Sequence, residues 1–346
     1  MASTKSLSEK INELKAEPIA EGDLVVKVPN RAAKRVLQKN GNLHKAKAEK
    51  NDEFYTRLED IEAEIKHYRK YFKGKVVLCN CDDPEWSNFF RYFALNFMFL
   101  GLKKLIATHY EPNGKSYALV VDSNLDVNGD GKFDLKDAVR VPLKGNGDFR
   151  SEECVKFLDE ADIVVSNPPF SLFREYVELL MQHKKKFIIV GNGNAITYKE
   201  VFKYIKENKL WLGASKGVCG KFTFIAPKTY VNKFTFDKDG VHYAQVNNAC
   251  WFSNLSHDKR NTPLDLVGNT YTPEKYPCYD NYNAIEVSKV SEIPDGYKGV
   301  MGVPITFLDK YCPEQFEIVK FRKGDDDKDL SVNGKCPYFR ILIKAK

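Results

Sequence analysis

Short apolar runs alternate with amphipathic segments from residue 52 to about residue 211. The apolar runs predict strands at residues 75–80, 104–109, 117–121, 163–166 and 187–190. The segments between them predict helices at residues 52–72, 86–100, 154–158, 172–181 and 198–208. Strands that alternate with helices predict an α/β fold with a doubly wound sheet. Beyond residue 212, short β-rich runs and turn residues take over, which indicates a smaller second module.

Three loops of this predicted fold follow strands directly, at residues 81–88, 167–170 and 191–194. Ligands of doubly wound sheets bind at the carboxyl ends of the strands. We therefore expect the three loops to lie at one ligand-binding edge of the sheet.

The second of these loops reads Asn167-Pro168-Pro169-Phe170. Two consecutive prolines remove two backbone N–H donors and fix two φ angles, so the loop is a rigid turn that presents carbonyl acceptors and the Asn167 amide. These acceptors suit a planar amino group such as N6 of adenine, and Phe170 offers a flat face on which a base can stack. The loop favours an amino-methyltransferase site, although a proline-capped strand end with Phe170 in the core has the same pattern.

The first loop, at residues 81–88, connects a buried strand to a helix that begins near Ser87. A nucleotide-type cofactor meets a helix N-terminus at such a place. The loop lacks Gly-x-Gly, and Ser87 and Asn88 also serve as ordinary helix-capping residues. Asp82 and Asp83 disfavour a pyrophosphate and fit the sulfonium or amino end of S-adenosylmethionine better.

Composition narrows the class of protein. The 346 residues are 43% hydrophobic and 29% charged, enough for one large domain or two smaller ones. No apolar stretch reaches membrane-spanning length and the chain starts without an apolar signal core, so we expect a cytoplasmic protein with no membrane partner. The eight cysteines are scattered without Cys-x-x-Cys spacing, which argues against structural zinc and against a disulfide framework.

A basic segment precedes the predicted fold. Residues 27–50 carry eight Lys or Arg side chains against one acid, Glu49, so the net charge of this segment equals the +7 of the whole chain. A weakly ordered basic arm is a common way to hold a phosphate backbone, and a merely solvated tail has the same composition.

An acidic loop follows the third predicted strand, with oxygen side chains at loop positions 1, 3, 5, 9 and 12 and Gly131 at position 6. Calcium loops have this spacing, although they end on Glu and follow a helix, whereas this loop ends on Asp and follows a strand. An acidic surface turn is the favoured interpretation, and a structural Ca²⁺ ion that takes no part in catalysis is the alternative. The candidate ligands are Asp126, Asn128, Asp130, Lys132, Asp134 and Asp137.

Longer segments carry a family resemblance. They are NDEFYT (51–56), VVLCNCDDPEWSNFFRYFALNF (76–97), GDFRS (147–151), DIVVSNPPFSLFREY (162–176), ITYKEVF (196–202), KGVMGVPITF (298–307) and SVNGKCPYFRILIK (331–344). Through these segments the chain resembles the EcoRI-type adenine-specific DNA methyltransferases, from about residue 40 to its end.

The resemblance implies an S-adenosylmethionine-dependent enzyme with a Rossmann-like methyltransferase sheet. The implied catalytic residues are Asn167, Pro168, Pro169 and Phe170. The implied cofactor-binding residues are Phe54, Tyr55, Thr56, Asp82, Asp83, Pro84, Ser87, Asn88, Asp148 and Phe149. Asp148 would accept from the cofactor's adenine amino group, and Glu111 is the candidate acid for its ribose. The chain then divides into a partly disordered basic arm (1–50), a catalytic domain (51–211) and a target-recognition region with C-terminal elements (212–346).

The resemblance also implies the reaction. A monomer would methylate N6 of an adenine flipped out of double-stranded DNA, at GAATTC or a related site, as the protective half of a restriction-modification system. The flipped base would stack on Phe170, and Phe222 or Phe224 would either close its other side or belong to the core. An amino-methyltransferase acting on RNA or on a protein glutamine stays an alternative, because Asn-Pro-Pro-aromatic loops serve those acceptors too. A DNA-binding protein without activity is a third.

Overall fold

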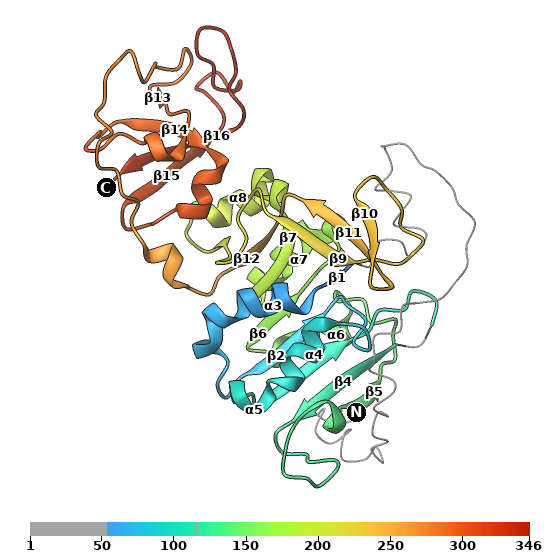
Figure 1. Ribbon diagram of the computed structural model, residues 1–346. Coiled ribbons are helices and arrows are strands. Elements are labelled where there is room, and N and C mark those ends of the chain that lie inside the picture. Colours follow the sequence, from blue (N-terminus) through green and yellow to red (C-terminus); the bar gives the residue numbers. More distant parts are fainter. Residues whose placement is uncertain (1–53, 115) are drawn as a thin grey trace. The chain divides into compact units, whose positions relative to one another are not determined.

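The computed structural model describes residues 54–114 and 116–346 (Figure 1). The basic segment at residues 27–50 lies outside the described residues. The chain forms two compact units. The first holds the described residues through Gly191 together with Lys221–Asn247, and the second holds Asn192–Gly220 and Asn248–Lys346. The target-recognition role of residues 212–346 stays a prediction.

Six consecutive strands of a mixed sheet form the framework of the first unit, in the order β5-β4-β3-β2-β6-β7. They are β2 (Val76–Asn80), β3 (Lys104–Thr108), β4 (Tyr117–Asp122), β5 (Val139–Pro142), β6 (Ile163–Ser166) and β7 (Lys186–Asn192). The strands β3, β2, β6 and β7 are parallel, and β4 and β5 add an antiparallel edge. Because β3 and β6 lie on opposite sides of β2, the strand order reverses there and opens a ligand position at the carboxyl ends of β2 and β6.

The burial of the central strands explains why they appear in the sequence as continuous apolar runs. β2, β3 and β6 are buried along their whole length. Parallel strands that are covered on both faces read as continuous apolar runs, not as alternating ones. The predicted α/β sheet of the Rossmann-like methyltransferase type is therefore confirmed. The predicted strand at residues 117–121 is present as β4, which pairs antiparallel with β3 and β5.

The helices of the first unit differ from the prediction at two places. The α-helices are α3 (Leu58–Ile65), α4 (Asn88–Leu95), α5 (Phe97–Leu100), α6 (Glu152–Glu160) and α7 (Phe173–Gln182), and the 3₁₀ turns are η2 (Lys66–Tyr71), η3 (Leu135–Asp137) and η4 (Phe170–Leu172). The predicted helix at 52–72 is too long, because Tyr55–Thr56 forms strand β1 by pairing with β9. The predicted helix at 86–100 breaks at Asn96, whose backbone leaves the helical region.

A second, four-stranded sheet completes the first unit, in the order β1-β9-β11-β10. Its strands are β1 (Tyr55–Thr56), β9 (Lys221–Ile225), β10 (Thr235–Lys238) and β11 (Val241–Asn247). All neighbouring strands are antiparallel. The sheet thus joins the beginning of the described chain to a segment from its second half.

The second unit contains its own four-stranded sheet, β13-β14-β16-β15. The elements of this unit are α8 (Lys199–Lys206), β8 (Trp211–Leu212), β12 (Ala249–Ser253), β13 (Ile285–Glu286), β14 (Val300–Pro304), β15 (Phe316–Phe321), β16 (Arg340–Ala345), η5 (Gly193–Thr197), η6 (Asp258–Asn261), η7 (Val290–Glu292) and η8 (Ile305–Lys310). Leu342 packs with Tyr279, Ala284 and Leu330 in its core. No helix among residues 54–114 and 116–346 has both the length and the apolar character needed to cross a membrane.

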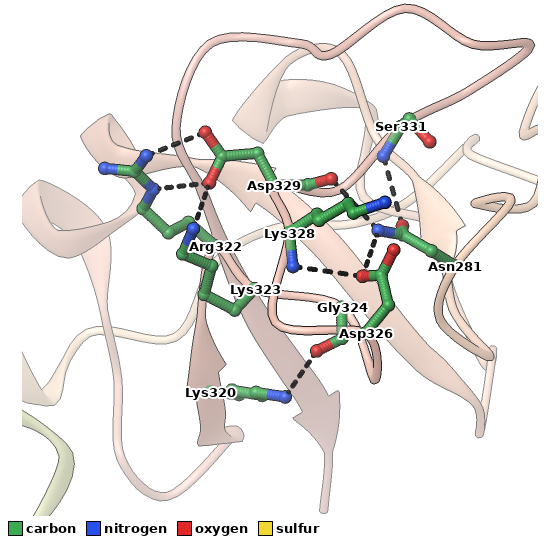
Figure 2. A network of polar contacts seen from close by, with 9 residues as sticks. All are labelled: Asn281, Lys320, Arg322, Lys323, Gly324, Asp326, Lys328, Asp329 and Ser331. Carbon is green, nitrogen blue, oxygen red and sulfur yellow. Dashed lines mark hydrogen bonds and ion pairs between the residues drawn. The ribbon is translucent and has the colours of Figure 1, made fainter.

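A polar network fixes the loop between β15 and β16 (Figure 2). Arg322 donates two hydrogen bonds to the Asp329 carboxylate, at 2.8 and 2.7 Å. Asn281 donates to Asp326 and to the Asp329 carbonyl, and it accepts from the backbone of Ser331. The loop is charged and partly exposed, yet its conformation is determined by side chains.

Candidate active site

The loop after β2 makes an unusual turn at Cys81. This residue has φ = 107°, in the region that favours glycine. The loop therefore adopts a glycine-like backbone at a position where the sequence shows a cysteine. Burial, and next the Asp82 charge, raise the pKa of the Cys81 thiol well above its ordinary value, so the group is a neutral thiol.

The helix after this loop begins as predicted. Ser87 caps α4, because its hydroxyl accepts from the backbone N–H of Phe89 at 3.2 Å. The same hydroxyl donates to the Asp82 carboxylate at 3.1 Å. Asn88 plays a different part from the expected cap: it is the first residue of α4, and its amide donates to the carbonyl of Thr56 at 2.8 Å. The cap and β1 are thus held together.

Asp83 lies in a network that sequence reasoning missed. Its carboxylate accepts from the Tyr117 hydroxyl at 3.0 Å and from the Glu85 backbone at 3.1 Å, and His109 Nε2 lies 3.7 Å away. The Tyr117 ring stacks on the His109 ring. The Arg140 guanidinium lies 3.7 Å from the centroid of the Tyr117 ring. These partners come from the β3–β4–β5 edge of the sheet, and no motif in the sequence marks them. They fix the direction of one acid of the loop.

The catalytic loop prediction centres on Asn167, whose side chain is oriented by one contact. The residue is 8% exposed. Its Nδ2 donates to the carbonyl oxygen of Phe54 at 2.7 Å. Its Oδ1 is buried and has no hydrogen-bond partner among the described residues. A buried amide oxygen without a partner is costly, so this atom is a ready acceptor for a ligand N–H.

The other residues of this loop become more exposed along the chain. Pro168 is buried, and Pro169 and Phe170 are half-buried. Phe170 begins the turn η4, which leads directly into α7. The alternative interpretation of this loop requires Phe170 to be a core side chain, but its ring is only half-buried.

The segment Phe54-Tyr55-Thr56 lies between the two loops. Asn167 binds the carbonyl of Phe54, and Asn88 binds the carbonyl of Thr56. The Phe54 ring packs against Phe224, with centroids 5.9 Å apart. The hydroxyl oxygen of Thr56 is buried without a partner among the described residues, like Asn167 Oδ1. The structure therefore brings together residues 54–56, Asn88 at the end of the first loop, and Asn167.

The two phenylalanines considered as a lid belong to the core. Phe222 and Phe224 are fully buried and stack on each other with centroids 5.4 Å apart. Their rings fill the inner face of the four-stranded sheet, so neither is available to cover a bound base.

A buried polar network beneath the site was also missed by sequence reasoning. The Tyr176 hydroxyl of α7 donates to the Asn80 side chain, and the Ser166 hydroxyl donates to the Asn80 carbonyl. Tyr176, Ser166 and Asn80 are at most 2% exposed. Asn80 precedes the first loop, Ser166 precedes Asn167, and Tyr176 follows the loop at residues 167–170. The network therefore couples both loops at their bases.

Asp148 and Phe149 lie close to the same network. The Phe149 ring packs edge-on against Tyr176 at 5.1 Å. Arg150 donates twice to the Asp148 carboxylate, at 2.9 and 2.7 Å, and also to Glu175 at 2.8 Å. The Arg150 guanidinium holds the pKa of Asp148 below its usual value, so Asp148 is an ionised acceptor.

The acidic loop at residues 126–137 does not resemble an occupied or ready metal site. Asp126 accepts from the backbone of Gly129 and Gly131, and Asp137 accepts from the backbone of Val127 and Asp134. Asp134 and Asp137 also form a capping box around η3. Among the described residues, no group of three His, Cys, Asp or Glu side chains is placed to hold a metal ion. The Ca²⁺ prediction therefore finds no support, because the loop's carboxylates bind its own amides.

A Rossmann-like sheet with Asn-Pro-Pro-Phe at the end of β6 defines the class of amino-methyltransferases. A family model described as adenine-specific methyltransferase EcoRI matches residues 42–346. The chain belongs to this family.

Three curated relatives agree with the family. The chain is 52% identical to the type II methyltransferase M.EcoRI of Escherichia coli over 322 residues, which cover 89% of this chain and 97% of the relative. It is 40% identical to M.MpnI of Mycoplasma pneumoniae over 88% of this chain and 98% of the relative. It is 38% identical to M.MgeORF184P of Mycoplasma genitalium over 88% and 99%. No solved structure gave a significant match.

The class of reaction follows from the family. The protein is an adenine-specific DNA methyltransferase of the type II restriction-modification kind. DNA is its substrate, and the methyltransferase family implies S-adenosylmethionine as the methyl donor.

Proposed function

We propose that this enzyme methylates N6 of one adenine, flipped out of duplex DNA, at GAATTC or a related site. The similarity to M.EcoRI supports the choice of site. The enzyme would act as a monomer and protect its host's DNA within a restriction-modification system. Nothing in the structure or the relatives favours RNA or a protein glutamine as the acceptor.

One observation carries the proposal: Asn167 Oδ1 is buried and unpartnered among the described residues while Nδ2 is held by Phe54. This orientation leaves the amide one free acceptor, as an exocyclic amino group requires. Hydrogen bonds from N6 to Asn167 Oδ1 and to the Pro168 carbonyl draw the amine towards tetrahedral geometry. Its lone pair then points away from both acceptors and becomes available for methylation. Since a neutral adenine amine is a weak nucleophile, orientation is the main contribution of the loop.

S-adenosylmethionine supplies the activated methyl group when it is bound. The residues present fit this molecule. Thr56 offers a buried hydroxyl without a partner among the described residues, and the acids Asp82 and Asp83 complement positive charge. Asp148, kept ionised by Arg150, suits the adenine amino group of the cofactor. We assign cofactor binding to Phe54, Tyr55, Thr56, Asp82, Asp83, Pro84, Ser87, Asn88, Asp148 and Phe149.

The target base has to leave the duplex to reach Asn167. Extrusion costs a few kcal/mol of stacking and pairing, which binding in the pocket must offset. The half-buried Phe170 offers its ring as the stacking surface. No dedicated base is required, because the proton lost from N6 can pass to water after the methyl group has been transferred.

Labelled methyl transfer to DNA tests the proposal. Purified protein with radiolabelled S-adenosylmethionine is offered a GAATTC duplex, a scrambled duplex, the same sequence as RNA, and a glutamine-containing protein. We expect label only in the GAATTC duplex, and sequencing of the product should place it on adenine N6. Equal labelling of the scrambled duplex would remove the assigned site, and label in RNA or protein would remove the assigned substrate.

Base flipping has its own measurement. 2-Aminopurine at the target position should brighten when the protein binds, because it loses its stacking partners. A mispaired base opposite the target should leave binding equal or tighter. Persistent quenching in a specific, cofactor-bound complex would contradict flipping.

A further inference from the structure

The four-stranded sheet of the first unit has one buried face and one open face. Along β9, every second residue is buried and the residues between them are exposed or half-buried. β11 shows the same alternation over most of its length. Phe222, Phe224, His242 and Ala244 form the buried face. Successive side chains of a strand point to opposite faces, so the remaining strand positions share the other face.

The strand register places a row of large side chains across the whole open face. Tyr55 of β1 pairs with Ile225 of β9, Ile225 pairs with Tyr243 of β11, and Tyr243 pairs with Phe236 of β10. The rings of Phe236 and Tyr243 stack with centroids 5.4 Å apart. Phe236 is 45% exposed although it lies on the edge strand β10. An exposed aromatic side chain on a sheet edge is a liability unless it has a partner.

The side chains that flank the row suit a nucleic acid. Thr223 pairs with Gln245, Lys221 with Asn247, and Lys238 with Val241. Among the described strand positions of this face, none is acidic. A sheet face that combines aromatic rings, uncharged polar groups and lysines offers stacking, hydrogen bonds and phosphate contacts together.

The row begins beside the methylation site. Tyr55 lies between Phe54, whose carbonyl holds Asn167, and Thr56, whose carbonyl holds Asn88. A DNA strand that delivers its adenine to Asn167 must therefore pass near this end of the row.

We propose that the open face of the β1-β9-β11-β10 sheet binds the DNA bases next to the flipped adenine. The aromatic row Tyr55, Tyr243 and Phe236 stacks on bases that lose their neighbour when the adenine leaves. Lys221 and Lys238 contact the adjoining phosphates. This assignment rests on the proposed function, since it requires a distorted duplex at the site.

Variants of Phe236 test the stacking surface. Its exposure makes Phe236→Ala compatible with folding, and Phe236→Tyr keeps the ring. With S-adenosylhomocysteine bound, we expect Phe236→Ala to weaken affinity for the target duplex about tenfold, the scale of one base stacked on an aromatic ring. Phe236→Tyr should bind like the unchanged protein. The matched control is Phe99→Ala, which removes another exposed phenylalanine of the same unit, 69% exposed on α5.

The lysines provide an independent readout. Lys238→Gln should make the dependence of log affinity on log salt shallower by about 0.9, the effect of one lost phosphate contact. Unchanged affinity in Phe236→Ala, or an equal loss in Phe99→Ala, would overturn the stacking surface, and an unchanged salt slope would remove the phosphate contact. Methyl transfer by the unchanged protein separates these outcomes from a failure of the proposed function. The proposed function fails only if the unchanged protein transfers no label to the duplex.

Discussion

The side-chain amide of Asn167 donates a 2.7 Å hydrogen bond to the backbone carbonyl of Phe54, 113 residues earlier in the chain. This contact decides which end of the amide faces the ligand. With the nitrogen bound to Phe54, only the oxygen is left to receive a hydrogen bond. Phe54 therefore orients the Asn167 amide, in addition to the cofactor-binding role proposed for its segment.

Asn167→Ala removes the acceptor and should reduce the rate of methyl transfer about a hundredfold or more, the scale of one transition-state hydrogen bond. Asn167→Asp keeps an acceptor but places a carboxylate oxygen against the Phe54 carbonyl, so we expect a comparable loss. Single-turnover transfer measures the rate, and calorimetry should show cofactor affinity within a few-fold of the original. Near-normal turnover by Asn167→Ala would refute the assigned role.

Tyr176→Phe tests the network that couples the two loops. It removes the hydroxyl that donates to Asn80, while Tyr68→Phe removes a comparable buried hydroxyl that donates to Glu64 at 2.9 Å on α3. Each variant removes one hydrogen bond to a buried acceptor and should lose about 1–3 kcal/mol of stability to urea. Only Tyr176→Phe should also slow methyl transfer, by about tenfold, with little change in DNA affinity. Equal transfer rates in the two variants would mean that the network is structural only.

Cys81→Gly tests the positive φ angle. Glycine adopts φ = 107° without strain, so we expect activity to persist and stability to change by at most about 1 kcal/mol. Cys81→Val should lose about 2 kcal/mol or more, because a β-branched side chain is strongly disfavoured there. Cys154→Gly is the control, since Cys154 lies within α6, where glycine is unfavourable. Urea unfolding of the three variants decides between a backbone effect and lost sulfur contacts.

Arg150→Gln should change how stability depends on pH. A carboxylate with a lowered pKa in the folded state stabilises the protein above its unfolded pKa of about 3.9, and this contribution is lost as pH falls through the folded value. Removing the guanidinium returns the pKa of Asp148 towards normal. The difference in free energy of unfolding between the original protein and Arg150→Gln should therefore be largest near pH 7 and decrease below about pH 4. A gap that stays constant down to pH 3 would mean that Arg150 acts by packing alone.

Arg340→Met should destabilise the second unit. Arg340 donates to both carboxylate oxygens of Glu286, at 2.9 and 3.1 Å through Nε, and both side chains are nearly buried. Removing one partner of a buried ion pair leaves the other charge buried without compensation, which lowers the free energy of unfolding by about 3–5 kcal/mol. Lys289→Met breaks an exposed pair with Glu292 and should cost under about 1 kcal/mol. Thermal unfolding of both variants checks the contrast.

Local pattern was sufficient for the central sheet and for the position of Asn167-Pro168-Pro169-Phe170 at the end of β6; the catalytic role of this loop stays a prediction. β2 and β6 are continuous apolar runs because both of their faces are covered, and Asn-Pro-Pro-Phe follows β6 directly. The Ser87 cap was readable for the same reason, since a cap depends on residues one turn away.

What the sequence did not reveal depends on distant partners. β1 is two residues long and exists only through its pairing with β9, so a helix was the local preference there. The turn at Cys81 adopts a glycine conformation without glycine, and a motif search for Gly-x-Gly passes over it. Tyr176 and Tyr117 acquire their roles from strand ends that meet only in three dimensions.

The discontinuity of the first unit sets an order of events during synthesis. Residues 54–191 leave the ribosome well before Lys221–Asn247, the segment that supplies the strand for β1. Until that segment emerges, Tyr55–Thr56 has no pairing partner and Phe54 lacks the Phe224 ring against which it packs. At a synthesis rate of about 5–20 residues per second, several seconds pass between the synthesis of Asn167 and that of β9. During this time, the segment that carries the Phe54 carbonyl has no strand to pair with. A chain truncated near residue 211 would therefore contain Asn167-Pro168-Pro169-Phe170 and residues 54–56, but not the strand β9 that pairs with Tyr55–Thr56.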